Sequence, residues 1–290
     1  MSKKYDLIFQ AAILAVLGAL LGVGSVYDAA AAEKLFTGEG FITVCTEILG
    51  KMPLFLAVSM ACCVAFFTAA DNKKLRAPKV WNVFLKMVYA AGGIFSASFM
   101  FKDLFDLFTE STLMSLAMCG MAGVALFTFL TIVTPRVGAE KLRALKKWAL
   151  VTILAALVIV CLTEAVKLLW GRARPYEVAE GATFTPWYML SSAGGESFFS
   201  GHAACCMGML MFVPLLRIND AEPVYRLVFA VLAALFIVCT MLGRMMSGAH
   251  YLTDVAAGAI ISEAVLFAAS ALAFRKGYEA KPGGFCEKYL

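Results

Sequence analysis

The stretch WALVTILAALVIVCLTEAVKLLWGRARP, residues 148–175, decides what kind of fold this chain adopts. Its apolar part is long enough to cross a bilayer as a helix, which takes about 20 residues. Three basic residues, Lys167, Arg172 and Arg174, stand at its end. The stretch therefore predicts a membrane-spanning helix that places cations at one membrane surface.

The composition of the whole chain agrees with a membrane protein. The 290 residues are 62% hydrophobic and only 16% charged, whereas a soluble domain usually has about 25% charged residues. The net charge is +5, but the basic residues lie in short links between apolar runs and not on one polar face. That distribution argues against a nucleic-acid-binding protein.

Eight apolar runs are candidate transmembrane helices, and we expect an all-α, polytopic helix bundle. The first run is longer than the apolar part of a signal peptide and has no convincing cleavage site, so we interpret it as a retained anchor. We expect three regions: helices without a motif in 1–147, a catalytic core in 148–274 and a cytoplasmic tail in 275–290. The runs are 7–31, 52–70, 80–101, 112–134, 148–169, 201–216, 226–244 and 252–274.

Lysine and arginine are enriched in the links on the side of the N-terminus, which indicates the cytoplasmic side. An even number of helices then places both termini in the cytoplasm. All the polar motifs described below fall on the outer face.

The nine cysteines indicate neither a disulfide framework nor a zinc site. Most of them lie inside apolar runs, where a free cysteine behaves as a small hydrophobic residue. No pair has the C-x-x-C spacing of a metal site. We therefore assign no zinc site, and we expect no cofactor.

The chain has two histidines, and His250 has the more informative surroundings. Arg244 precedes it and Asp254 follows it, in the pattern R-x5-H-x3-D. If a helix begins here, His250 and Asp254 share a face, and a carboxylate on one ring nitrogen leaves the other free for nucleophilic attack. The alternative is a structural His–Asp pair at the start of a helix.

The second histidine, His202, follows Ser200 and Gly201 at the expected start of a helix. Such a position offers free N–H groups to an anion, and a histidine there could protonate a leaving oxygen. The alternative is a capped helix with an interfacial histidine. Lys167 and Arg174 could likewise bind a phosphate or simply extend from a helix end toward water.

The link 171–200 contains several aromatic residues, among them Phe184, Trp187 and Tyr188. They could cover a site as a lid, or they could form the aromatic belt that is common at membrane interfaces.

These motifs resemble those of the type-2 phosphatidic acid phosphatase superfamily: K-x6-R-P, then P-S-G-H, then S-R-x5-H-x3-D. Lys167 to Arg174-Pro175 matches the first motif in full. In the second motif Phe199 replaces proline, and in the third Gly243 replaces serine. The resemblance covers about 164–254, with the motifs in the order of the family. Many members have six helices, so it also implies two extra N-terminal helices here.

The resemblance implies a role for each matching residue. His250 would be the nucleophile, Asp254 would orient it, and His202 would protonate the leaving group. Fixed cations would neutralise the phosphoryl group without a metal. That group would be bound by Lys167, Arg174, Arg244, Ser200 and Gly201, with Glu164 and Arg172 in support.

The resemblance also implies a lipid phosphate or diphosphate as substrate, cleaved at the outer face of a bacterial cytoplasmic membrane. Undecaprenyl diphosphate is the first expectation, and phosphatidic acid, phosphatidylglycerol phosphate and lipid A-type phosphates remain open. Two other functions remain open as well. One is a phosphotransferase that uses the same histidine, and the other is a lipid-phosphate binder or transporter with impaired hydrolysis. The expected partners of the protein are its lipid substrate and the surrounding membrane lipids.

Overall fold

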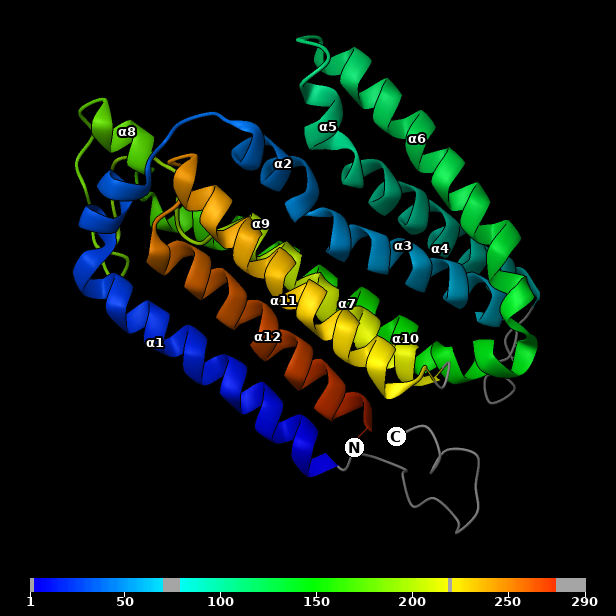
Figure 1. Ribbon diagram of the computed structural model, residues 1–290. Helices are drawn as coiled ribbons and strands as arrows, with labels where there is room; N and C mark the ends of the chain where they lie inside the picture. Colours follow the sequence, from blue (N-terminus) through cyan, green and yellow to red (C-terminus); the bar gives the residue numbers. More distant parts are fainter. Residues whose placement is uncertain (1–2, 70–78, 219–220, 275–290) are drawn as a thin grey trace.

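The computed structural model describes residues 3–69, 79–218 and 221–274, and every regular element in these ranges is a helix. Helices suit an apolar chain because they satisfy their backbone hydrogen bonds internally, without water. Two 3₁₀-helices, η2 (Thr134–Val137) and η3 (Met207–Phe212), join α6 to α7 and α9 to α10. The α-helices in Figure 1 are α1 (Lys3–Leu35), α2 (Phe41–Gly50), α3 (Met52–Thr68), α4 (Lys79–Met100), α5 (Lys102–Asp106), α6 (Thr112–Val133), α7 (Ala139–Trp170), α8 (Pro175–Ala179), α9 (Gly201–Cys206), α10 (Val213–Ile218), α11 (Pro223–Met246) and α12 (Leu252–Phe274).

Seven helical segments within the described ranges are long and apolar enough to cross a membrane. Their outer faces expose large apolar side chains, such as those of Val80, Leu113 and Leu227. In a bilayer these side chains would meet acyl chains and not water. The chain is an integral membrane protein, and the prediction of an all-α polytopic bundle is confirmed.

The sixth predicted span, 201–216, is not one continuous α-helix. It is divided into α9, η3 and α10. At Gly208 an added Cβ would lie 2.6 Å from the backbone nitrogen of Leu54, so η3 and α3 touch almost backbone to backbone. Pro214, which has no N–H to donate, then begins the last piece. A further helix, α2, precedes the predicted span 52–70 and was not expected.

The core of the bundle is built from α1, α3, α7, α9, α11 and α12. Helix α1 packs along α12, α7 packs against α3 and α12, and α9 lies among α3, α11 and α12 (Figure 1). A Cβ on Gly24 would lie 2.7 Å from the side chain of Thr253, so glycine allows α1 to approach the start of α12. The central cluster of buried apolar side chains includes Leu54, Ile159 and Phe199.

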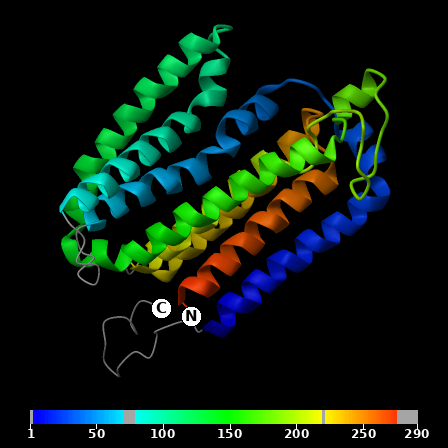
Figure 2. The ribbon, with the colours of Figure 1, turned by 180° about the vertical axis from the view of Figure 1, so that it is seen from behind.

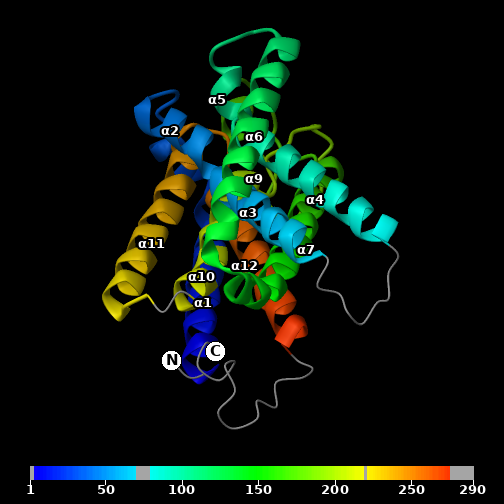
Figure 3. The same cartoon turned by 90° about the vertical axis from the view of Figure 1, so that its right-hand side faces the viewer.

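Helices α4, α5 and α6, residues 79–133, form an outer hairpin that packs mainly on α3 (Figures 2 and 3). Glycines make this packing close, because a Cβ on Gly93 would overlap the ring of Phe127 and one on Gly123 would overlap Ser98. The two helices outside the core are therefore α4 and α6. They lie between α3 and α7 in the chain, within the region 1–147 that carries no motif.

Helix α7 carries basic residues at both of its ends, but only one end carries a motif residue. Helix α7 has 32 residues, so about 48 Å separate its two ends. Lys141, Arg143, Lys146 and Lys147 lie at its start, and the motif residue Lys167 lies at its far end, near α8 (Figure 1). The predicted cytoplasmic tail, 275–290, and the basic link 70–78 lie outside the described residues.

Candidate active site

His250 lies in the short link between α11 and α12, and its ring is held by the loop before α9. The ring Nδ1 lies 2.7 Å from the backbone oxygen of Ser197. A carbonyl oxygen can only accept, so Nδ1 must carry the hydrogen, and Nε2 keeps a free lone pair. The backbone N–H of His250 donates to the carbonyl oxygen of Arg244 at 3.2 Å. The link thus holds the ring with one nitrogen available for attack.

Asp254 does not bind His250 directly, contrary to the expected hydrogen bond. Its Oδ2 lies 3.9 Å from His250 Nδ1, because the Ser197 carbonyl occupies that position. The same Oδ2 accepts hydrogen bonds from the Ser197 hydroxyl at 2.5 Å and from the backbone N–H of Tyr251 at 2.9 Å. Asp254 therefore fixes Ser197, and Ser197 fixes the histidine.

Arg172 does not point toward a phosphate position, although the sequence placed it with the other two cations. Its side chain is fully buried and donates to Asp254 at 2.5 Å and to Asp28 of α1 at 2.9 Å. It also donates to the backbone oxygen of Thr185 at 2.8 Å and lies over the ring of Tyr251. Because two carboxylates neutralise it inside the protein, Arg172 joins α1 to α12 and supports Asp254.

The three motifs meet at the end of the bundle that holds α8. A Cβ on Gly201 would lie 3.7 Å from Lys167 Nζ, which places the first motif beside the second. The backbone N–H of Ser200 donates to the carbonyl oxygen of Asp254 at 3.0 Å, which joins the second motif to the third. The Ser200 side chain caps α9 by accepting from the N–H of Ala203 at 3.3 Å.

Each of the three motif cations has a glutamate beside it. The glutamate side chains are at least half exposed, whereas the cations are mostly covered. The pairs are Lys167–Glu164 at 3.9 Å, Arg174–Glu196 at 3.5 Å and Arg244–Glu47 at 3.4 Å. All three distances exceed those of good charge-assisted hydrogen bonds, which are about 2.7–2.9 Å.

Arg244 has unused hydrogen-bonding capacity. Its Nε and Nη1 are buried, and neither has a hydrogen-bond partner within the described residues. A buried N–H without a partner is uncommon and usually marks a functional position or a place for a ligand. Arg244 is therefore ready to donate to an anion next to His250.

The electrostatic surroundings keep His250 neutral. Burial lowers the pKa of His250 well below its ordinary value, and the charge of Arg244 lowers it further. Arg174, His202 and Lys167 act in the same direction. A neutral ring with a free Nε2 is the form that can attack phosphorus.

The other histidine, His202, is held by parts of the chain that carry no motif. Its Nε2 lies 3.2 Å from the backbone oxygen of Glu47 in α2 and 3.6 Å from Asp103 in α5. The sequence did not point to Glu47, Asp103, Asp28 or Ser197. Their spacing to the motif residues follows no local pattern, so only the folded chain brings them together.

Packing accounts for both departures from the family motifs. The side chain of Phe199, which replaces proline, is fully buried in the central apolar cluster. At Gly243, which replaces serine, an added Cβ would lie 2.1 Å from the hydroxyl oxygen of Thr46. Helix α2 lies so close to α11 that no side chain fits at this position.

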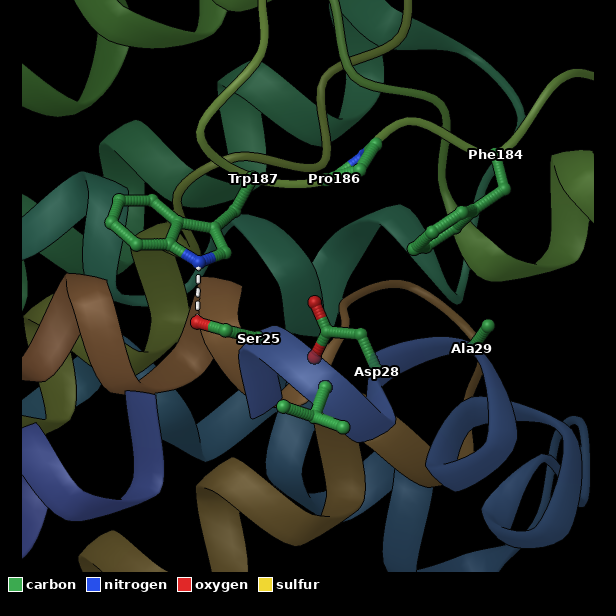
Figure 4. A pocket seen from close by; sticks show the side chains of 7 residues that line it. Ser25, Asp28, Ala29, Phe184, Pro186 and Trp187 are labelled. Atoms are coloured by element: carbon green, nitrogen blue, oxygen red, sulfur yellow. Dashed lines mark hydrogen bonds between the residues drawn. The ribbon is translucent and has the colours of Figure 1, made fainter. Parts of the chain in front are cut away.

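The aromatic residues of the link 171–200 fold back onto the protein. Trp187 donates from Nε1 to Ser25 of α1 at 2.8 Å (Figure 4). The ring of Trp187 stacks on Phe198. Phe184 packs edge-to-face on Tyr251. A small pocket lies between this link and α1, lined by Ser25, Val26, Asp28, Ala29, Phe184, Pro186 and Trp187 (Figure 4). Neither histidine lines it.

Residues 146–278 match the family model of the PAP2 superfamily. This region contains all three motifs and both histidines. This part of the chain, residues 146–278, belongs to the PAP2 superfamily. PAP2 members are in general phosphoesterases, so membership supports a phosphatase that acts on a lipid phosphate. No curated protein and no solved structure gives a significant match.

Proposed function

We propose that this PAP2 protein hydrolyses a lipid phosphate or diphosphate through a phosphohistidine on His250. The observation that carries the proposal is the combination of a free Nε2 on His250 with two buried nitrogen atoms of Arg244, Nε and Nη1, that have no hydrogen-bond partner within the described residues. Lys167 and Arg174 lie close enough for their charges to act on the same ring. Fixed donors aimed at a developing negative charge are a principal source of catalysis.

The proposed reaction has two steps. In the first, His250 Nε2 attacks phosphorus, the bond from phosphorus to the leaving oxygen breaks, and His202 gives that oxygen a proton. In the second, water attacks the phosphohistidine and gives a proton to His202, which releases phosphate and restores both histidines. Asp254 holds Ser197, and Ser197 holds the His250 ring in the correct tautomer throughout.

The substrate is proposed from the position of the site and from the resemblance. The motifs lie at one end of the bundle, where a lipid headgroup can enter while its tail stays in the bilayer. With the site on the outer face of a bacterial cytoplasmic membrane, undecaprenyl diphosphate is the first candidate. Phosphatidic acid, phosphatidylglycerol phosphate and lipid A-type phosphates are the others.

The test is the release of inorganic phosphate by the purified protein, in detergent and with a chelator present, from a panel of these lipids. Release is expected to persist with the chelator and to disappear in His250→Ala. Acid-labile, base-stable phosphate on the protein during turnover would identify the intermediate as phosphohistidine. If the protein releases no phosphate from any lipid while still binding them, the hydrolase proposal is wrong.

A further inference from the structure

The outer hairpin reaches the active site at one residue, Asp103 in α5. Its Oδ2 lies 3.6 Å from Nε2 of His202, and its Oδ1 accepts a hydrogen bond from Lys51 Nζ at 2.9 Å. The side chains of His202 and Asp103 are only 9% and 17% exposed. When His202 is protonated, a pair so well covered is screened less by water and salt than a surface pair.

The ring of His202 is held on its Nε2 side. Nε2 lies 3.2 Å from the backbone oxygen of Glu47, which can only accept, so Nε2 carries a hydrogen. Next to Nε2 in the ring, Cδ2 would lie 3.2 Å from a Cβ on Gly50, so α2 packs directly against this edge of the ring. While Nε2 stays bound, a proton for the leaving oxygen must come from Nδ1. The ring then has to be doubly protonated and positively charged.

Burial is the largest influence on the charge of His202, and it opposes a positive ring. Arg244 in α11 and Lys51 between α2 and α3 oppose a positive ring as well, whereas Asp103 in α5 favours it. Glu47 in α2 is directed to Arg244. Asp103 is therefore the carboxylate that directly faces the ring.

Asp103 keeps its negative charge at all ordinary pH values. Burial would raise its pKa, but the contact with His202 and the charge and hydrogen bond of Lys51 outweigh burial and lower the pKa to about 2. Lys51 in turn holds the carboxylate in place through the 2.9 Å hydrogen bond.

We propose that Asp103 is a positioning residue for His202. It orients the ring through Nε2 and stabilises the doubly protonated form that donates a proton to the leaving oxygen. This role rests on the proposed function, in which His202 protonates the leaving group. It gives the outer hairpin, which lies outside the region matched by the family model, a part in the reaction.

The test compares two substrates that differ in their need for an acid. An alkyl phosphate such as dodecyl phosphate has a poor leaving group, whereas 4-nitrophenyl phosphate has a good one. General acid catalysis contributes about 100- to 10,000-fold, so losing its positioning in Asp103→Asn is expected to lower kcat/KM for dodecyl phosphate about tenfold. The loss for 4-nitrophenyl phosphate is expected to be less than about twofold, because that leaving group needs little help from an acid.

Asp106→Asn is the matched control. Asp106 lies in the same short helix, but it binds Lys102 and Ser115 instead of His202. It is expected to leave the ratio of the two substrates unchanged. Asp103→Asn is also expected to add no loss to that of His202→Ala, because both changes remove the same function.

Equal losses on both substrates in Asp103→Asn, or the same change of ratio in Asp106→Asn, would overturn this inference alone. A further loss in the double variant would do the same. A wild-type protein that is inactive on both substrates would instead overturn the proposed function, and this inference with it.

Discussion

At the scale of single residues, burial and the nearby cations keep His250 neutral, and the hydrogen bond to Ser197 leaves its Nε2 free for the proposed attack. Because the pKa of His250 is lowered, its ring is expected to stay neutral as the pH falls from 8 through 6.5. Isotope-labelled histidine makes this measurable by NMR, since the chain has only two histidines. His202→Gln identifies the remaining signal as His250. A midpoint at or above pH 6.5 would contradict the expectation.

Arg172 and Arg174 are two positions apart, and their expected roles differ. Arg172→Gln leaves Asp28 and Asp254 buried without their partner, which is expected to lower the free energy of unfolding by about 3–5 kcal/mol. Arg174→Gln breaks a partly exposed pair with Glu196, which is worth about 0–1 kcal/mol, and a long hydrogen bond to Tyr176. Arg174→Gln is instead expected to raise KM. Thermal unfolding in detergent and steady-state kinetics test both, and equal stabilities of the two variants would show that Arg172 does not join α1 to α12.

At the scale of elements, the contact between α2 and α11 explains why the family serine is absent at Gly243. Restoring it in Gly243→Ser would overlap Thr46, at an expected cost of about 1–3 kcal/mol. Thr46→Gly in the same chain is expected to recover part of this loss. Gly120→Ser in α6 is the control, because an added Cβ there meets no atom within 4 Å. Equal thermal unfolding midpoints for the two serine variants would contradict the close contact.

The contacts between helices show how much of the site could be predicted from the sequence alone. The spacing of the motifs predicted which polar residues gather, and the fold brings Lys167, His202, Arg244 and His250 to one end of the bundle. Local spacing cannot reveal partners on distant helices. Arg172 joins Asp28 to Asp254, two residues that are far apart in the chain. Asp103 reaches His202 only because α4 and α6 fold as a hairpin on α3. The divided sixth span also escaped prediction, because it depends on contact with α3.

At the scale of the whole molecule, the proposed orientation places α8 outside the cell and the start of α7 inside. Two exposed glutamates mark these ends, Glu180 after α8 and Glu140 in the first turn of α7. In intact cells a membrane-impermeant maleimide is expected to label Glu180→Cys, whereas Glu140→Cys is expected to need permeabilised cells. The unmodified chain gives the background from native cysteines. Labelling of Glu140→Cys alone in intact cells would reverse the orientation.

The glutamates beside Lys167, Arg174 and Arg244 have a consequence for turnover. An unshielded set of three cations would hold free phosphate tightly and suffer inhibition by its own product. In the proposed reaction, a departing phosphate would exchange with carboxylates that are already tethered within reach, so the site would return to near electroneutrality without drawing ions from solution. The proposed site thus contains its own counter-ions for the release of phosphate.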